Sequence, residues 1–354
     1  MTAVTDIREP GFAEELGAAA ADFLRGEGFP DRLRDDAPDI CGLHRQVADL
    51  GLLGVLVPEE GGGIGGGAAE LVAVFRAVGR GLLPLPLAES VAAASVLADD
   101  GYADGTTMLA LAGVMTGDPW AGSTLDGDRI TGRAGLVNGA GVADRLLVPA
   151  WDTSGARVLA LVAAGQARFT PVAATDRTYR PAEAEFTGAP ATTVARGAEA
   201  ERAWRQVLTV GRIAAAAELT GIANRLVELA VAYVGERKQF GRPVGSFQAV
   251  KHLAADAATT AYAMDSLCRR LAGGELTGLD AEHWADSAKA FCSRAALQVA
   301  ETALQMFGGI GFTAEHDLAL YFPRILTLGD RWGDPAALEA ALGARALADA
   351  RGRS

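Results

Sequence analysis

ERKQFGRPVGSFQAVKH, residues 236–252, is the stretch of sequence that decides the fold. A helix that carries Arg237 is expected to end before Pro243, because proline cannot continue a helix. Arg237 and Arg242 therefore stand at a corner between two helices, where the second helix presents its positive end. Guanidinium groups beside a helix N-terminus can bind an anion. Taken alone, the pattern is more typical of a solvated basic corner.

A second stretch, QMFGGIGFTAEHDLALYFPR at residues 305–324, is rich in glycine. Gly308, Gly309 and Gly311 end a long helix and let another backbone come close. Gln305 lies one turn earlier, where its amide can reach a group above the glycines. A helix C-cap followed by a loop accounts for the glycines equally well, so the motif by itself leaves both interpretations open.

The pattern of apolar residues changes twice along the chain. Residues 1–108 show apolar positions at helical spacing, and so do residues 198–354, where the helices are long and rich in alanine. Residues 109–197 carry short apolar runs separated by Gly, Asp, Pro and Thr, which is typical of strands and turns. The sequence therefore predicts an α+β protein that is mainly α, with an N-terminal helical domain, a small middle β domain and a C-terminal helical domain.

A glycine cluster, GGGIGGG at residues 61–67, contains the spacing of a dinucleotide-binding loop. Pro58, Glu59 and Glu60 precede it in place of a strand, and two carboxylates are poor neighbours for a pyrophosphate. We therefore expect a flexible loop between two helices.

The composition excludes several classes of protein. The chain has 354 residues, 50% of them hydrophobic, and a formal net charge of −12. This excludes a disordered chain and argues against a protein held on nucleic acid by phosphate contacts. No apolar run reaches the roughly 18 residues of a membrane span, and the scattered Cys and His show no metal-ligand spacing. The polar, acidic start differs from a signal peptide, so we expect a cytoplasmic protein without a metal site.

Three stretches in this order, LGLLGVLVPEEGGGIGGG at residues 50–67 and the two described first, resemble signatures of the acyl-CoA dehydrogenase family. The resemblance covers nearly the whole chain and is closest to short, actinobacterial-type members. It implies that the β domain is a small barrel, that the C-terminal domain is a four-helix bundle, and that FAD lies between subunits. Each subunit would then hold part of a site, which implies a homodimer, a homotetramer or a heterotetramer with a related subunit.

The resemblance also implies which residues contact FAD. In the family, the arginine matching Arg237 holds the FAD pyrophosphate, and the glycine-ended helix receives the ADP portion of the neighbouring subunit's FAD. In the β domain, Asn138 replaces a flavin-contacting threonine and can still form a hydrogen bond, whereas Leu136 replaces a tryptophan. The residues assigned to FAD in this way are Arg237, Gln239, Phe240, Gln305, Gly308, Gly309 and Asn138.

The catalytic base of the family is missing. The family's reaction needs a carboxylate to remove the proton α to the thioester. The family keeps this glutamate at one of two places, which are Trp332 and Gly211 in this chain. Glu218, two helical turns from Gly211, and Asp330, beside Trp332, are the substitutes that the sequence offers. For Glu218, an ion pair with an arginine of the bundle is the favoured alternative.

Three functions remain open. The resemblance implies an FAD-dependent enzyme that dehydrogenates an acyl-CoA or acyl-carrier thioester, by itself or as one subunit of a complex, with an electron-transfer flavoprotein as a candidate acceptor. A second interpretation is a catalytically silent subunit that completes the sites of another chain. A third is an oxygen-using flavin enzyme, such as an N-hydroxylase or oxidase, which needs no α-proton base.

Overall fold

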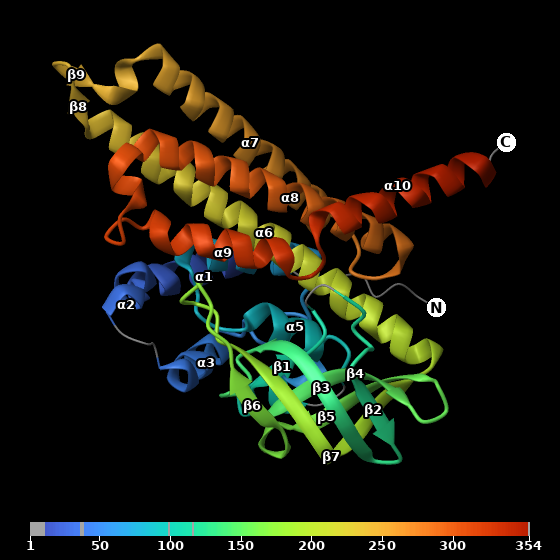
Figure 1. The fold of residues 1–354 in the computed structure, drawn as a ribbon. Helices are drawn as coiled ribbons and strands as arrows, with labels where there is room; N and C mark the ends of the chain where they lie inside the picture. Colours follow the sequence, from blue (N-terminus) through green and yellow to red (C-terminus); the bar gives the residue numbers. More distant parts are fainter. Residues whose placement is uncertain (1–10, 36–38, 98–99, 115–116, 353–354) are drawn as a thin grey trace.

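The structure is a computed structural model that describes residues 11–35, 39–97, 100–114 and 117–352. Helices of the N-terminal and C-terminal parts form the upper body in Figure 1, and a barrel of strands lies below them. This is the mainly helical, three-part architecture that the sequence predicts, and the fold class is confirmed.

The N-terminal part is helical. Its helices are α1 (Phe12–Glu27), α2 (Phe29–Asp35), α3 (Ile40–Asp49), α4 (Ala68–Gly81) and α5 (Leu87–Ala94). The apolar residues of α4, among them Leu71 and Phe75, are fully buried, which explains why this short helix holds the N-terminal part to the rest of the chain.

The middle part is a closed sheet. Its strands are β1 (Leu109–Leu111), β2 (Ser123–Asp126), β3 (Arg129–Asn138), β4 (Arg145–Asp152), β5 (Arg157–Ala163), β6 (Arg168–Pro171) and β7 (Pro181–Arg196). The pairings run β4-β2-β3-β7-β5 and return from β5 to β4, so the sheet closes into a barrel. Its interior is filled by small, branched and aromatic side chains such as Ile130, Val158 and Phe186.

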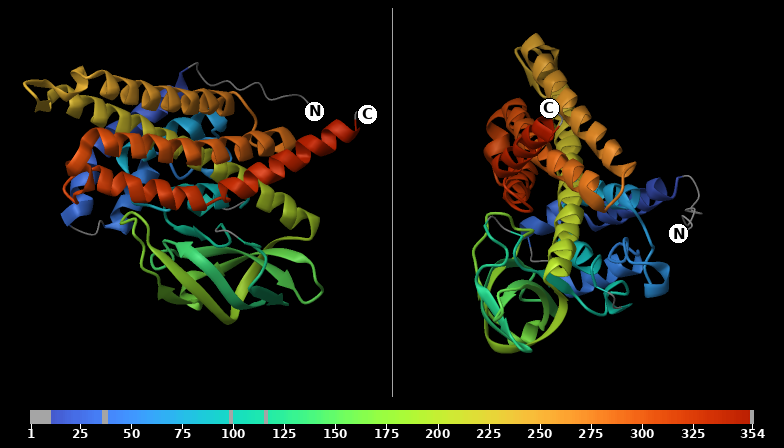
Figure 2. Two further views of the ribbon diagram at one scale, coloured as in Figure 1. Left: turned by 45° about the horizontal axis from the view of Figure 1, so that its top comes forward. Right: turned by 90° about the vertical axis from the view of Figure 1, so that its right-hand side faces the viewer.

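The C-terminal part contains the longest helices. They are α6 (Ala198–Glu236), α7 (Gln248–Ala272), α8 (Gly278–Phe307), α9 (Leu318–Asp330) and α10 (Pro335–Gly352). A small hairpin of β8 (Lys238–Gln239) and β9 (Arg242–Pro243) joins α6 to α7. Helix α6 runs through the middle of the molecule between the barrel, the N-terminal helices and the bundle, whereas the end of α10 projects away from the body (Figures 1 and 2).

Helices α4 and α6 cross in direct backbone contact. A Cβ atom at Gly221 would lie 2.1 Å from the carbonyl oxygen of Arg76, and one at Gly79 would lie 2.0 Å from that of Glu218. Only glycine permits this approach, and it brings the middle of α6 against the N-terminal part.

The glycine cluster between α3 and α4 is closely packed. The N–H of Ile64 donates to the carbonyl of Gly54 at 2.9 Å, and that of Gly66 donates to Val55 at 2.7 Å. A Cβ atom at Gly63 would lie 2.2 Å from the carbonyl oxygen of Val57. The stretch is a loop between two helices, as expected. It differs from the expectation in its close packing, because these glycines serve backbone-to-backbone contacts.

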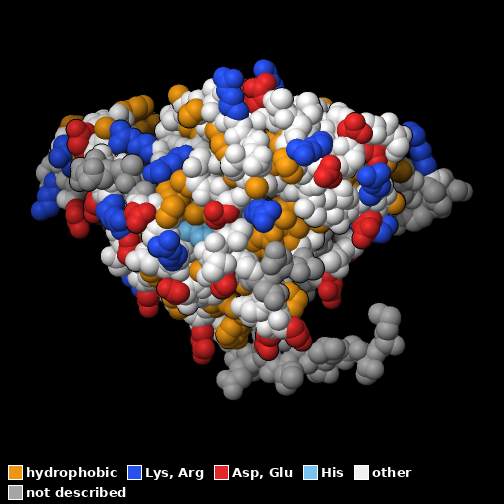
Figure 3. Space-filling view, turned by 90° about the horizontal axis from the view of Figure 1, so that it is seen from below, with side chains coloured by type: hydrophobic (Ala, Val, Ile, Leu, Met, Phe, Trp, Pro, Cys, Tyr) orange, Lys and Arg blue, Asp and Glu red, His pale blue; other side chains and the backbone are white. Residues whose placement is uncertain are grey.

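The surface carries charges of both signs. On the face that includes the barrel, Lys and Arg side chains are interspersed with Asp and Glu (Figure 3). Within the described ranges, no helix is both long and apolar enough to cross a membrane. In the same part of the chain, no group of three or more His, Cys, Asp or Glu side chains could hold a metal ion.

Replacement of Gly221 by alanine is expected to destabilise the fold. The added Cβ would overlap the carbonyl of Arg76, so we expect the free energy of unfolding to fall by about 2 kcal/mol. Gly235, in the last turn of the same helix, is exposed with open space around it. The control Gly235→Ala should leave stability unchanged or raise it by about 0.5 kcal/mol. Urea denaturation measures both, and equal effects would contradict the backbone contact.

Candidate active site

Trp332 is buried at the centre of the molecule in an unusual backbone conformation. It lies two residues beyond the end of α9, is 1% exposed and has a φ of 64°, in the left-handed region. Its N–H donates to the carbonyl of Val114 at 2.9 Å, and its carbonyl accepts from Nε of Arg212 at 2.8 Å. The barrel side and α6 therefore both hold the backbone of this residue.

The ring of Trp332 lies directly on Gly211 of α6. A Cβ atom at Gly211 would lie 2.2 Å from two carbon atoms of the indole. The two positions that the resemblance marks for a glutamate therefore touch each other. Neither carries a carboxylate, and position 211 cannot hold any side chain while the indole is present.

On the side that faces Glu89, the space beside the indole is almost completely filled. The other side of the indole borders a hollow of about 260 Å³, which Trp204 and Arg212 also line. The cavity that remains between Glu89, Asn138, Tyr179, Arg331 and Trp332 measures about 10 Å³. A single buried water needs about 10–15 Å³, so no organic substrate fits there in this conformation.

Arg331 fills much of this space with a buried charge. Its Nη2 donates to Oε1 of Glu89 at 2.5 Å, and its guanidinium lies 4.7 Å from the centre of the Tyr179 ring. Burial lowers the pKa of Arg331, and the charge of Glu89 acts in the opposite direction. The hydroxyl of Tyr179 also donates to Glu89, at 3.3 Å.

Asn138 belongs to the same cluster. Its side-chain Nδ2 donates to Oε1 of Glu89 at 3.3 Å, and its Oδ1 accepts from the N–H of Arg180 at 3.1 Å. Asn138 is buried, so its amide is used inside the protein. The hydrogen bond to flavin that the resemblance implies stays a prediction, and the second N–H and the second lone pair of the amide remain for it.

Glu218 is held in a second buried ion pair. Its carboxylate lies 2.6 Å from Nη2 of Arg324, whose Nη1 donates to the Thr178 hydroxyl at 2.6 Å. Burial raises the pKa of Glu218, and Arg324 counteracts this shift. For Glu218, the sequence favours an ion pair with an arginine of the bundle over the role of catalytic base, and the structure contains this ion pair. Asp330, the other proposed substitute, is exposed at the end of α9.

The FAD-assigned residues of the first motif lie on the hairpin at the end of α6. Arg237, Gln239 and Phe240 are all exposed, and Phe240 is 91% exposed with a φ of 53°. Arg242 stacks its guanidinium 3.9 Å from the centre of the Phe247 ring. The basic corner predicted from the sequence is therefore present and open to a partner.

The glycine motif follows α8 and lies at the same end of the C-terminal helices as the hairpin, whereas Asn138 belongs to β3 of the barrel (Figures 1 and 2). Gln305, Gly308 and Gly309 are exposed, and Cβ atoms at the two glycines would meet nothing within 4 Å. The structure thus brings six of the seven assigned residues to one end of the molecule.

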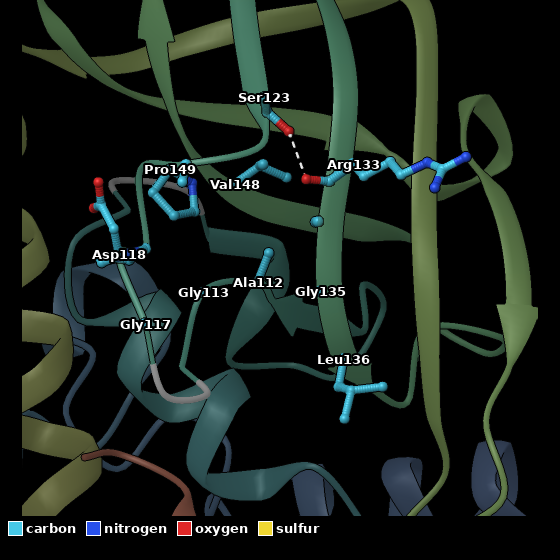
Figure 4. A pocket seen from close by; sticks show the side chains of 13 residues that line it. Ala112, Gly113, Gly117, Asp118, Ser123, Arg133, Gly135, Leu136, Val148 and Pro149 are labelled. Atoms are coloured by element: carbon cyan, nitrogen blue, oxygen red, sulfur yellow. Dashed lines mark hydrogen bonds between the residues drawn. The ribbon is translucent and has the colours of Figure 1, made fainter. Parts of the chain in front are cut away.

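A shallow pocket lies where the resemblance implies the flavin ring. Strand β3 and the loop after β1 form it, with Gly113, Asp118 and Leu136 among the lining residues (Figure 4). Its volume is about 100 Å³, below the roughly 300 Å³ of a typical ligand pocket. The side chain of Arg133 points away from it (Figure 4).

Comparison with known proteins identifies the family. The chain matches the models "Acyl-CoA dehydrogenase, N-terminal domain" over residues 12–105 and "Acyl-CoA dehydrogenase, C-terminal domain" over residues 201–329. It is 31% identical to the acyl-CoA dehydrogenase IpdE2 of Mycobacterium tuberculosis, over 88% of this chain and 86% of that protein. The chain belongs to the acyl-CoA dehydrogenase family. Members of this family are FAD-dependent flavoenzymes.

Other relatives differ in length or in assembly. The chain is 33% identical to the acyl-CoA dehydrogenase FadE34 of Mycobacterium tuberculosis over 88% of its own length, but it spans only 43% of FadE34. Among solved structures, the Tcur3481-Tcur3483 steroid ACAD G363A variant is 28% identical with a TM-score of 0.85, covering 96% of this chain and 98% of that one. The ChsE4-ChsE5 complex from Mycobacterium tuberculosis is 26% identical with a TM-score of 0.82, covering 97% and 99%.

Sequence reasoning missed the residues that fill the space beside Trp332. Glu89 and Tyr179 carry no motif, and their role depends on contacts far along the chain. Arg331 is the residue from which the sequence could have indicated this arrangement. It directly precedes Trp332, so it places a cation beside the position where the family needs a carboxylate.

The contact between Gly211 and Trp332 can be measured by a double-mutant cycle. We expect Gly211→Ala to lower the free energy of unfolding by about 2 kcal/mol, because the new methyl group overlaps the indole. In a Trp332→Leu background the same change should cost less than about 0.5 kcal/mol, a coupling within the range of about 0.5–3 kcal/mol for touching residues. Additive effects would show that the two positions do not meet.

The role of Glu218 can be separated from that of Asp330. Glu218→Gln removes the nearer of the two buried carboxylates paired with Arg324 and leaves Asp176 at 3.8 Å, so we expect a loss of stability of about 2 kcal/mol. Asp330→Asn changes an exposed carboxylate and should alter stability by less than about 0.5 kcal/mol. Thermal denaturation compares the two variants, and a fully stable Glu218→Gln protein would contradict the structural role.

Proposed function

We propose that this chain is the non-catalytic subunit of a heteromeric acyl-CoA dehydrogenase, in which a related second chain supplies the glutamate and the acyl-CoA cavity. The observation that carries the proposal is the contact between Trp332 and Gly211, which leaves neither base position able to accept a proton. Removal of a weakly acidic α-proton needs a carboxylate placed at the reacting carbon.

The filled space beside the two base positions supports the same conclusion. Next to Trp332 the chain holds the guanidinium groups of Arg324 and Arg331, each paired with a buried carboxylate. Opening this space would expose or separate buried charges, at a cost of about 3–5 kcal/mol for each broken pair.

The exposed residues fit a contribution to FAD at the subunit boundary. Arg237 offers a guanidinium fork for a pyrophosphate, Gln239 and Gln305 offer amides, and the open backbone at Gly308 and Gly309 leaves room for the ADP portion. FAD, when bound, supplies the hydride acceptor of the dehydrogenation. Asn138, by contrast, is buried and binds Glu89 and the backbone of Arg180, so we propose that this chain completes the FAD site of its partner at the hairpin end.

Two solved neighbours support a heteromer. One is described as a complex of ChsE4 with ChsE5, and the other as a Tcur3481-Tcur3483 steroid ACAD. We therefore propose an acyl-CoA thioester as the substrate of the complex, with a steroid-derived acyl-CoA as the first to assay. We further propose that the complex works in the cytoplasm and passes its electrons to an electron-transfer flavoprotein.

Purification of the chain alone and together with a glutamate-bearing homologue tests this function. Alone, the protein should not be bleached by acyl-CoA under anaerobic conditions. The mixed complex should be yellow and should bleach. In that complex Arg237→Ala should lower bound FAD at least roughly tenfold, the loss expected when a charge-assisted pair is removed, whereas Lys238→Ala, on the same exposed hairpin, should not. Bleaching of the chain by itself would contradict the proposal, and oxygen-consuming turnover would support the oxygen-using interpretation instead.

A further inference from the structure

Lys289 of α8 is a fully buried lysine, with 0% of its surface exposed. Its Nζ lies 3.0 Å from the hydroxyl of Ser293, 2.9 Å from the carbonyl oxygen of Gly329 and 3.0 Å from that of Gly333. The two carbonyls lie on either side of Trp332, so one cation binds the backbone before and after the indole. The site already described does not use this group.

The three contacts need three donors. The Ser293 hydroxyl gives its proton to the carbonyl of Lys289 at 2.7 Å, so it can only accept from Nζ. The carbonyls of Gly329 and Gly333 are acceptors as well. An ammonium group has three N–H donors and satisfies all three, whereas a neutral amine has two and must leave one unmade.

The backbone at Trp332 needs such support. A left-handed conformation is unfavourable for a bulky residue and persists only when its surroundings impose it. Val114 and Arg212 hold Trp332 itself, and Lys289 holds the residues around it.

We propose that Lys289 is a positioning residue whose ammonium group clamps the turn at 329–333 and so keeps the indole of Trp332 on Gly211. This proposal rests on the proposed function and deepens it, because in that function the indole of Trp332 closes the acyl cavity. Loss of one of the three hydrogen bonds should release the turn and let the ring move.

The electrostatic surroundings place this change near pH 8. The pKa of Lys289 is lowered from 10.5 to about 8, mainly by burial and also by the charge of the neighbouring Arg212. Asp330, Asp334 and the Cys292 thiol oppose the shift. Because the unfolded chain binds the proton more tightly, this lysine makes the free energy of unfolding rise with pH between about 8 and 10.5. A turn that loosens above pH 8 would therefore be a local change, because the contribution of this lysine to the global free energy of unfolding increases over the same pH range.

The experiment follows Trp332 by ¹⁹F NMR in protein labelled with 5-fluorotryptophan. The chain has five tryptophans, and the Trp332 resonance is the one lost in Trp332→Phe. In the wild type this resonance should shift with a midpoint near pH 8. In Lys289→Met the shift should be lost, whereas Lys251→Met, which changes an exposed lysine of α7, should retain it.

A second variant keeps the test decisive if Lys289→Met does not fold. Ser293→Ala removes one acceptor, so a neutral amine can still serve both carbonyls, and the shift should become smaller. A wild-type Trp332 resonance that does not move between about pH 7 and 9, or an undiminished shift in either variant, would overturn the proposal. The readout needs neither FAD nor substrate, so its failure is distinct from failure of the heteromer.

Discussion

The indole of Trp332 and the backbone of Gly211 occupy each other's space, and the chemistry of the whole chain depends on this contact. These are the two positions at which the resemblance to the acyl-CoA dehydrogenase family implies a catalytic glutamate. A Cβ atom at Gly211 would overlap the ring of Trp332. The large side chain at position 332 therefore fits only because position 211 is a glycine. A carboxylate could return to position 211 only if the ring left.

The surroundings of the indole come from parts of the chain that are distant in sequence. Helix α5 contributes Glu89, α6 contributes Glu218, and α9 with the residue after it contributes the two arginines. Buried ion pairs add little net stability compared with apolar packing, but the loss of one partner is costly. Such pairs therefore favour one arrangement of the helices and the barrel, and here that arrangement leaves almost no cavity among the buried charges themselves.

The packed surroundings of Trp332 and the exposed residues assigned to FAD lie in different parts of the molecule. The hairpin after α6 and the glycine-ended α8 expose Phe240 and Phe312, which are 91% and 78% exposed, beside the residues assigned to FAD. Large exposed aromatic side chains at one end are typical of a surface that another chain covers. A subunit that completes a neighbour's site needs this surface and does not need a cavity of its own.

The sequence by itself determined the family and the order of the three parts, because helical periods and short motifs are local properties. It also shows Gly211 and Trp332 where the resemblance implies a glutamate. It also favoured an ion pair for Glu218, but could not name Arg324 as its partner. Only the tertiary structure decided that Trp332 meets Gly211, that the amide of Asn138 binds Glu89, and that the glycine cluster is packed rather than flexible. Each of these depends on contacts between segments far apart in sequence, which the crossing of helices and the closure of the barrel create and no local pattern encodes.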